Sequence, residues 1–331
     1  MKICSPMAYG NGAHVVHKIL ESDLKGYAVC DYSPYWTLFP PALPFLCSNR
    51  NADIIHTTPD YGLFFHKNNT PLILTFHNYV LDDFMQTYSS LAQRIHYKTD
   101  SKWFTKHSLD LATIVTSVSK FTAELVRKET GYTKEIRVIY NGINVEKFKP
   151  ALHKTGGPIK ILFSGNLTKR KGAHLLPAIA DKLNPGIVIQ YTKGLRTKGI
   201  KFNASNLQNI GTVKYSDMPK VYQQADILLL PTIREGFSMA VLEAMASRLP
   251  VVTTDCSSLP EQIIQGKGGY LCELQNVEDF AGRINELADS LQLRKQMGEF
   301  NREKIENEFT LEKMVKNYRT LFEEILSSGQ S

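Results

Sequence analysis

The length, composition and charge of the chain indicate a soluble protein of two domains. The chain has 331 residues, which exceeds one ordinary core and fits two domains of about 150 residues each. Hydrophobic residues make up 43% and charged residues 21%, and no apolar run reaches the ~18 residues that a membrane span requires. The net charge of +7 is spread along the chain, which argues against nucleic acid as a partner and is equally compatible with an anionic membrane surface or a phosphate-bearing substrate.

The amino-terminal sequence and the cysteines predict a cytoplasmic protein. Residues 1–7 form a short apolar run without an Ala-x-Ala cleavage site, so a first strand is expected there rather than a signal peptide. The five cysteines are odd in number, scattered, and without C-x-x-C spacing, so all of them are expected to be reduced core residues. They are Cys4, Cys30, Cys47, Cys256 and Cys272. An association with the inner face of the membrane is left open.

The first half of the chain alternates short apolar runs with longer amphipathic runs. This pattern is typical of βαβ units around a parallel sheet. Strands are predicted near residues 2–7, 27–31, 53–57, 71–76, 112–116 and 136–140, and helices near 13–22, 83–107 and 119–129. The stretch 33–41 carries too much proline for a helix or a central strand, so an irregular surface loop is predicted.

A glycine loop follows the first predicted strand. Gly10 and Gly12 lie between that strand and the helix that follows. Tight strand-to-helix turns use glycine in any case, so the loop alone is a weak indication of a ligand site. His14, on the following helix, is expected to be structural.

A histidine stands at the end of the predicted strand 71–76. His77 follows Thr75-Phe76 and precedes Asn78. Open α/β sheets bind ligands at the carboxyl ends of their strands, where a histidine can donate a hydrogen bond or transfer a proton. A hydrogen-bonded core histidine is the alternative.

A basic amphipathic stretch occupies residues 91–107. Its cations could lie on an anionic bilayer surface, but an ordinary helix that packs Leu91, Ile95 and Phe104 on the core is the favoured interpretation.

A second series of strands and helices begins after a linker. Residues 149–158 are rich in proline and glycine, which predicts a domain boundary near residue 150. Strands are predicted near residues 159–163, 186–191, 208–213, 226–231, 250–254 and 269–272, and helices near 173–183, 217–224, 239–247, 258–265 and 277–290. An apolar stripe of period 3.6 predicts a last helix over residues 311–326. The expected domains are residues 1–150 and 151–310, followed by a carboxy-terminal segment 311–331.

The second half contains the two segments that point to phosphate chemistry. Residues 163–172 read FSGNLTKRKG, a strand that ends in glycine and continues into a basic loop. Residues 226–247 read DILLLPTIREGFSMAVLEAMAS, a buried strand, a turn at Glu235-Gly236 and a helix for which Ser238 is a good N-cap. Free N–H groups of residues 237–240 would attract a diphosphate.

The second of these segments, followed by Leu249-Pro250-Val251-Val252, resembles the Glu-x7-Glu signature of the family 4 glycosyltransferases. The resemblance covers nearly the whole chain, and it is strongest from 136 to 272 and weakest from 33 to 108. It implies an α/β protein of the GT-B fold, with two Rossmann-like lobes whose parallel sheets face each other across a cleft. The first lobe would bind the acceptor and the second the donor, and the last helix would cross back to the first lobe.

The resemblance also implies the role of each candidate residue. Glu235 would contact the hydroxyls of the donor sugar, Glu243 would bind the nucleotide ribose, and the amides of Phe237, Ser238 and Met239 would hold the diphosphate. Lys171 matches the lysine that neutralises the departing nucleotide. Asn166 stands where many members have an arginine, so Arg170 would supply the second charge. Gly10, Gly12 and His77 would lie near the donor phosphate and the sugar.

The activity implied is retaining transfer of a hexose-like sugar, with a UDP-sugar as the favoured donor. The acceptor would be a glycan or a lipid-linked saccharide in the synthesis of a surface polysaccharide. No metal or other cofactor is expected, because two basic side chains and a helix N-terminus can take the place of a divalent ion. Two alternatives remain: another nucleotide-sugar enzyme such as an epimerase, and a non-catalytic partner subunit of the same fold.

Overall fold

The chain folds into two compact units, which are described separately. The computed structural model describes residues 1–47, 51–89, 100–151, 156–193, 202 and 204–328. The first unit consists of Met1–Asn141 and Lys313–Ser331, and the second of Gly142–Glu312. The first unit thus ends before the boundary expected near residue 150. Much of the stretch 91–107 interpreted above lies outside the described residues.

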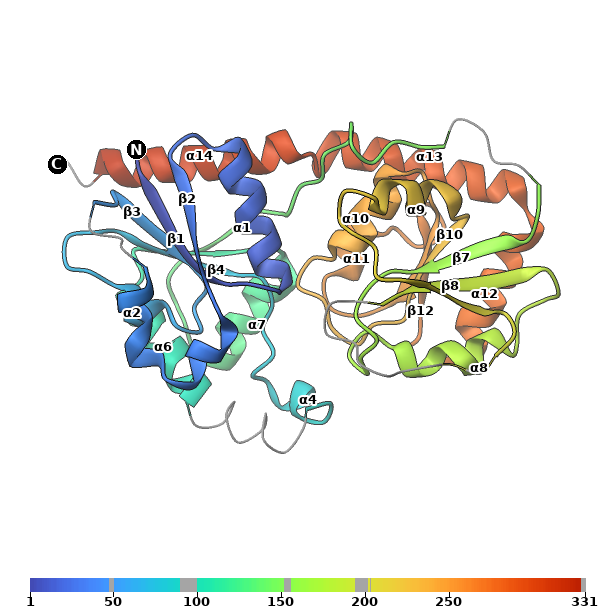
Figure 1. The fold of residues 1–331 in the computed structure, drawn as a ribbon, viewed down its shortest axis with the longest axis horizontal. Coiled ribbons are helices and arrows are strands. Elements are labelled where there is room, and N and C mark those ends of the chain that lie inside the picture. The colour runs from blue at the N-terminus through green and yellow to red at the C-terminus, as the bar shows by residue number, and fades with distance from the viewer. Residues whose placement is uncertain (48–50, 90–99, 152–155, 194–201, 203, 329–331) are drawn as a thin grey trace. The chain divides into compact units, whose positions relative to one another are not determined.

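The first unit is built on a six-stranded sheet in the order β2-β1-β3-β4-β5-β6. Every pair of neighbouring strands is parallel, as the alternating pattern predicts. The strands are β1 (Ile3–Ala8), β2 (Tyr27–Tyr32), β3 (Ile54–Thr57), β4 (Leu72–Phe76), β5 (Ile114–Ser117) and β6 (Ile136–Val138). The longer helices are α1 (Gly12–Asp23), α6 (Lys102–Leu111) and α7 (Lys120–Thr130), with short turns α2 (Leu43–Leu46), α3 (Gly62–Phe65) and α4 (Asp83–Gln86) (Figure 1).

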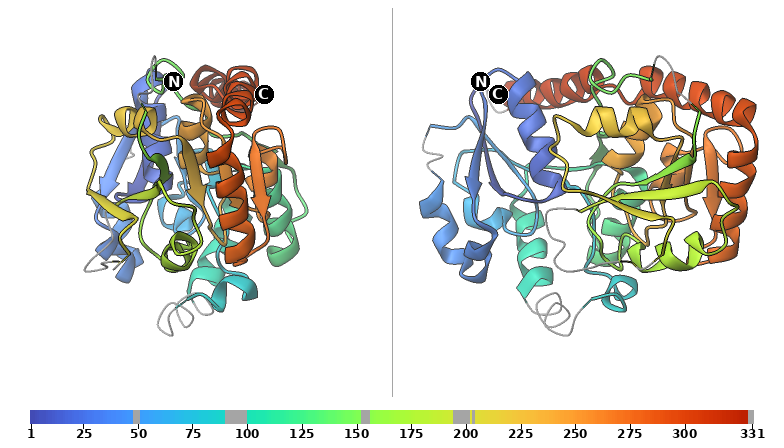
Figure 2. Two further views of the ribbon diagram at one scale, coloured as in Figure 1. Left: turned by 90° about the vertical axis from the view of Figure 1, so that its right-hand side faces the viewer. Right: turned by 45° about the vertical axis from the view of Figure 1, so that its right-hand side comes forward.

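The second unit repeats this architecture with the strand order β12-β11-β10-β7-β8-β9. Its strands are β7 (Ile159–Phe163), β8 (Ile187–Thr192), β9 (Leu207–Gly211), β10 (Ile227–Leu230), β11 (Val251–Thr254) and β12 (Gly269–Cys272). Its helices are α8 (Leu176–Ala180), α9 (Met218–Gln224), α10 (Met239–Ala246), α11 (Leu259–Gln262), α12 (Val277–Asp289) and α13 (Leu291–Glu308) (Figure 2). The central strand β10 is buried along its whole length, so its carboxyl end is a fixed platform for the residues that follow.

The chain runs from one unit to the other twice, and the two crossing segments lie side by side. Ile143 donates its N–H to the carbonyl of Phe309 and accepts from the N–H of Leu311, at 2.9 Å each. A Cβ on Gly142 would lie 2.3 Å from the carbonyl oxygen of Thr310, so only glycine fits this close approach. The last helix, α14 (Leu311–Ser328), then packs Tyr318 and Phe322 against rings of the first unit.

The prediction that all five cysteines are reduced is wrong for two of them. Cys30 of β2 and Cys47, at the end of α2, form a disulfide with their Cα atoms 5.8 Å apart. The spacing gave no sign of this pair, because the intervening segment folds back onto the strand from which it leaves. Disulfides persist mainly in oxidising compartments, so the cysteines give no support to a cytoplasmic location. Cys4, Cys256 and Cys272 are free.

The segment expected to be an irregular loop contains short helical turns. Residues 34–46 form the 3-10 turns η1 (Pro34–Leu38) and η2 (Pro40–Ala42) and then α2. Proline is tolerated here because each turn carries it within its first two positions, where a backbone N–H has no partner to lose.

Candidate active site

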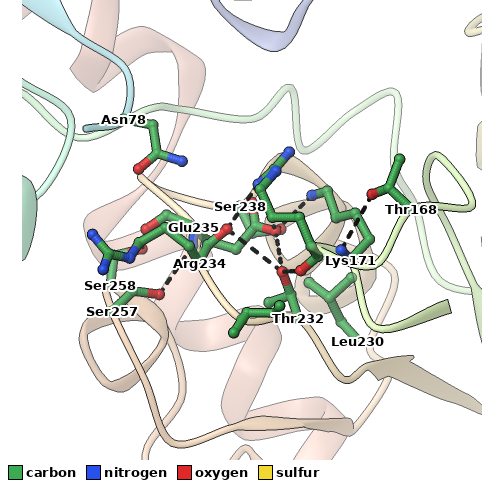
Figure 3. A network of polar contacts seen from close by, with 12 residues as sticks. Asn78, Thr168, Lys171, Leu230, Thr232, Arg234, Glu235, Ser238, Ser257 and Ser258 are labelled. Carbon is green, nitrogen blue, oxygen red and sulfur yellow. Dashed lines mark hydrogen bonds and ion pairs between the residues drawn. The ribbon is translucent and has the colours of Figure 1, made fainter. Parts of the chain in front are cut away.

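An ion pair between two segments of the second unit forms the centre of the candidate site. Lys171, in the loop after β7, donates from Nζ to Oε1 of Glu235, in the turn after β10, at 2.6 Å. The two side chains are only 15% and 8% exposed. Oγ1 of Thr232 donates to the same carboxylate oxygen at 2.9 Å, and Nη1 of Arg170 lies 3.8 Å from it (Figure 3). Three predicted residues, Arg170, Lys171 and Glu235, thus share one site.

Backbone contacts hold the two segments together. The carbonyl of Arg170 accepts from the N–H of Ile233 at 2.8 Å and shares the single hydroxyl proton of Thr232 with Glu235, since Oγ1 of Thr232 lies 2.9 Å from each acceptor. Nη1 of Arg170 donates to the carbonyl of Arg234 at 2.8 Å. Gly172 adopts φ +76°, and a Cβ there would lie 1.9 Å from the carbonyl oxygen of Pro231. The lysine is therefore placed by a glycine that presses directly against the end of β10.

The charges of the pair reinforce each other in spite of their burial. Burial raises the pKa of the Glu235 carboxyl, but the Lys171 ammonium and the Arg170 guanidinium outweigh it and hold that pKa below its ordinary value. Burial lowers the pKa of Lys171, and Glu235 opposes this change. The site therefore holds the Glu235 carboxylate between two cations. A ligand of suitable charge can separate the carboxylate from the cations.

Two serines to which the sequence analysis gave no role position the backbone of Glu235. Oγ of Ser257 accepts from the N–H of Glu235 at 3.0 Å, and Oγ of Ser258 donates to its carbonyl at 3.2 Å. Ser257 adopts φ +51°, a left-handed conformation that favours glycine. The two hydroxyls thus bind the backbone of Glu235 at both its N–H and its carbonyl.

The helix after the turn is α10, and Ser238 is its N-cap residue, as predicted. Its hydroxyl makes no capping bond, however, and its N–H is not free as expected, because it donates to Oε1 of Gln262 at 2.9 Å. Nε2 of Gln262 returns a bond to the carbonyl of Ser238. Among the described residues, buried Oγ of Ser238 has no hydrogen-bond partner. Since the first N–H groups of a helix have no partner within it, the N–H groups of Met239 and Ala240 and the Ser238 hydroxyl can donate to a ligand.

Glu243 lies inside α10 and is 6% exposed. Burial raises its pKa to about 7, although a hydrogen bond with Tyr222 and the charges of Lys147 and Lys171 lower it. Among the described residues, this buried carboxyl has no counter-ion in direct contact. Its oxygens are therefore suited to accept hydrogen bonds from hydroxyl groups. Asn166 lies three residues beyond β7 in the loop that carries Lys171, and it takes part in that loop through its carbonyl, which accepts from the N–H of Thr168.

Replacing Glu243 by glutamine is expected to stabilise the protein at alkaline pH. The pKa rises from 4.5 to about 7 on folding, so the folded state binds the extra proton and its stability falls as pH rises from 4.5 through 7. Glutamine does not ionise, so the variant does not lose this stability as pH rises. The loss in the wild type amounts to about 3 kcal/mol at pH 8 and vanishes below pH 4.5. Urea unfolding at pH 5 and pH 8 measures the difference.

The matched control for this variant is Glu299→Gln, an exposed residue of α13. It should change stability little at either pH. Equal effects of the two substitutions at pH 8 would contradict the perturbed pKa of Glu243.

The first unit contains a buried network of histidines that includes His77. Nε2 of His77, directly after β4, lies 3.0 Å from Nε2 of His17 on α1. Nδ1 of His17 contacts Oγ of Ser5 and OH of Tyr27, at 2.7 Å each, and the tyrosine OH also contacts Nδ1 of His56 at 2.7 Å. Burial lowers the pKa of His17, His56 and His77, so all three rings are neutral.

This network orients the His77 ring. If Nδ1 of His17 accepts from the two hydroxyls, Nε2 of His17 carries the proton and donates to Nε2 of His77. Because Nε2 of His77 accepts this bond, the single N–H proton of the neutral His77 ring lies on Nδ1. Histidines spaced like His17 and His56 carry no recognisable motif, so only the packing of α1 and β3 beside β4 reveals them.

The other candidates of the first unit lie in the turn between β1 and α1. Gly10 adopts φ +82°, and a Cβ added to Gly10 or to Gly12 would meet no heavy atom within 4 Å, so both residues face open space. Asn11 caps the helix by accepting from the N–H of His14 at 2.8 Å. Nε2 of His14 contacts Asp31 at 2.7 Å, a structural role.

Neither a metal site nor a membrane-spanning helix is found in the part of the chain that the structure describes. No group of three or more His, Cys, Asp or Glu side chains there could hold a metal ion. No helix there is long and apolar enough to cross a membrane.

Comparisons with known proteins match each half of the chain to a family model. Residues 144–304 match the family model described as glycosyl transferases group 1, and residues 7–147 match the model described as glycosyltransferase family 4. An uncharacterized glycosyltransferase of Methanocaldococcus jannaschii is 27% identical over 290 residues, which are 85% of this chain and 78% of that protein.

Solved structures share the fold over the full length of the chain. Sucrose-phosphate synthase from Thermosynechococcus elongatus matches with a TM-score of 0.84 and 16% identity, over 99% of this chain and 100% of that one. Anabaena HepE in complex with UDP-glucose matches with a TM-score of 0.79 and 16% identity, over 99% and 100%. At these identities the likeness shows the fold alone.

Proposed function

Since the chain belongs to the family 4 glycosyltransferases of GT-B fold, we propose that it moves a hexose-like sugar from a nucleotide diphosphate donor with retention at the anomeric carbon. The buried ion pair of Lys171 and Glu235 beside the N-terminus of α10 carries this proposal. It supplies the cation and the carboxylate that the two ends of such a donor require.

Donor binding divides this ion pair between the two ends of the ligand. The Lys171 ammonium and the Arg170 guanidinium turn to the diphosphate, which also accepts from the Met239 N–H and the Ser238 hydroxyl. Glu235, held by Ser257 and Ser258, accepts hydrogen bonds from the sugar hydroxyls. Glu243, deeper in the helix, accepts from the ribose. Each charge of the ion pair thus exchanges one partner for another, which limits the cost of desolvation.

Transfer proceeds without a metal ion or another cofactor in this proposal. When the bond from the anomeric carbon to the diphosphate breaks, negative charge develops on the leaving oxygen. Lys171 and Arg170 stabilise that charge more strongly than the smaller charge of the bound donor, so they act on the rate and not only on binding. His77, whose ring is oriented by His17, is the proposed hydrogen-bonding partner of the sugar. A chelator should leave transfer unchanged.

A UDP-sugar is the favoured donor, and a glycan or a lipid-linked saccharide is the proposed acceptor. The donor is supported by HepE, the structural neighbour that was solved with UDP-glucose. Synthesis of a surface polysaccharide at the inner face of the membrane is the pathway that we propose for this chain. The redox state of Cys30 and Cys47 in cell extracts, read by alkylation before and after reduction, tests the cytoplasmic location.

A thermal-shift screen of UDP, GDP and ADP and their sugars tests the donor. A ligand at 100 times its dissociation constant stabilises by about 2.7 kcal/mol. We expect UDP-glucose to raise the melting temperature of the wild type and not that of a variant with Lys171→Met and Glu235→Gln. If only guanine nucleotides raised the melting temperature, guanine would replace uracil as the proposed base of the donor. Donor consumption without any acceptor would favour an epimerase or hydrolase.

A further inference from the structure

The segment between the disulfide cysteines exposes a dense apolar surface. We call residues 33–46 the aromatic loop. Within it, Tyr35 is 81% exposed, Leu38 84%, Phe39 64% and Phe45 89%. Trp36 is 45% exposed. Exposed large apolar side chains are ordinary when single, but five within eleven residues form a patch that needs an occupant.

The aromatic loop is built so that it cannot bury these side chains on its own unit. The disulfide closes it at both ends, and Tyr32 and Leu43 anchor it in the core of the first unit. Oγ1 of Thr37 donates to the carbonyl of Pro34, and four prolines restrict the backbone. The exposed rings are therefore presented outward by a stiff frame.

The charges on and beside the loop indicate what covers it. Residues 32–47 contain no charged side chain. The short helix α3 packs against both α2 and α6, so α6 is the long helix on the other side of α3, and Figure 1 shows α2 and α6 at the same end of the first unit. Lys106 and the 52% exposed Trp103 lie on α6, and Lys102 precedes them. Of the acids nearby, Asp31 at the foot of the loop is paired with Lys18 and His14, while Asp60 before α3 and Asp110 on α6 are exposed.

We propose that the aromatic loop docks into the headgroup region of a lipid bilayer, with Lys102 and Lys106 facing anionic headgroups. Tryptophan, tyrosine and phenylalanine without charge are typical of the bilayer interface, where their rings reach apolar chains and their polar atoms stay hydrated. Neighbouring lysines add attraction to anionic lipids. Arginine is also enriched at protein–protein interfaces, and residues 32–47 contain none.

This assignment gives the main membrane contact to the aromatic loop, and from the basic stretch 91–107 it uses Lys102 and Lys106. It rests on the proposed function for its purpose, which is to bring a lipid-linked acceptor within reach of the enzyme. Its test uses vesicles with neither donor nor acceptor, so it can fail while sugar transfer stands, and transfer can fail while it stands.

The two tryptophans of the chain provide the test, because one lies in the aromatic loop and the other on α6. The Trp103→Phe variant leaves Trp36 as the only reporter. We expect its emission to shift to the blue on vesicles of phosphatidylcholine with phosphatidylglycerol as the minor component, and to be quenched by lipids brominated on the acyl chains. The wild type should sediment with the same vesicles.

A triple variant, Leu38→Ser, Phe39→Ser and Phe45→Ser, is expected to weaken vesicle binding at least tenfold, since all three side chains are exposed and folding does not depend on them. Leu291→Ser, 58% exposed on α13, is the matched control and should bind as the wild type does. The melting temperatures of all of these variants, measured by circular dichroism without ligand, should equal that of the wild type, which confirms that they are folded.

Three outcomes would overturn the proposal. The first is no blue shift of Trp36 on vesicles, and the second is vesicle binding that the triple variant leaves unchanged. The third is dimerisation in solution that the triple variant abolishes while neither protein binds vesicles. That result would make the aromatic loop an interface between two copies of the chain.

Discussion

Replacing Lys171 by methionine is expected to lower the rate of sugar transfer by about 10²–10³-fold. The ammonium lies 2.6 Å from Glu235 and beside the N-terminus of α10, where the leaving diphosphate is proposed to bind. Because negative charge grows on the leaving oxygen during the reaction, the loss should fall more on kcat than on KM. Steady-state kinetics with UDP release as the readout measure both constants.

Two further variants separate chemistry from stability. Lys171→Met alone leaves Glu235 buried without its main partner, which destabilises a protein by about 3–5 kcal/mol. Adding Glu235→Gln removes the second charge and should restore much of the stability but none of the activity. Lys169→Met makes the same charge change on an exposed neighbour and should keep most of the rate. A folded Lys171→Met enzyme with the wild-type rate would remove this lysine from the mechanism.

Replacing Gly172 by alanine is expected to destabilise the second unit by about 2–5 kcal/mol and to abolish donor binding. An L residue at φ +76° costs about 1–2 kcal/mol, and a Cβ at 1.9 Å from the backbone of Pro231 adds about 1–3 kcal/mol of overpacking. The clash lies on backbone at the end of β10, so the loop must withdraw and take Lys171 with it. Hydrogen exchange in peptides of β7 and β10, with urea unfolding, reports the effect.

Gly186→Ala is the matched control for this variant. Gly186 belongs to the same unit and has φ +85°, but its Cβ would meet no atom within 4 Å. Its substitution should therefore cost only the backbone term and leave donor binding intact. If Gly172→Ala and Gly186→Ala lose the same stability and both bind UDP-glucose, the contact with Pro231 does not position the loop.

The candidate site was predictable where its residues form one local motif. Glu235, Ser238 and Glu243 lie on one strand, turn and helix, so their spacing predicts their placement. Ser257, Ser258 and Gln262 contact the same turn from the segment after β11, and nothing in their own sequence indicates it. The hydroxyl of Ser238 shows a further limit, because a suitable N-cap residue need not make the capping bond when a buried glutamine binds its backbone first.

The sequence by itself determined the two parallel sheets and the turns that bear Lys171 and Glu235, because hydrophobic periodicity and glycine placement act over a few neighbouring residues. Only the tertiary structure decided the strand orders and the pairs that they bring together. Lys171 meets Glu235, Cys30 meets Cys47 and His17 meets His77 across elements that are distant in the chain. Such contacts depend on how strands and helices stack, and no local pattern encodes which distant partner will stand opposite.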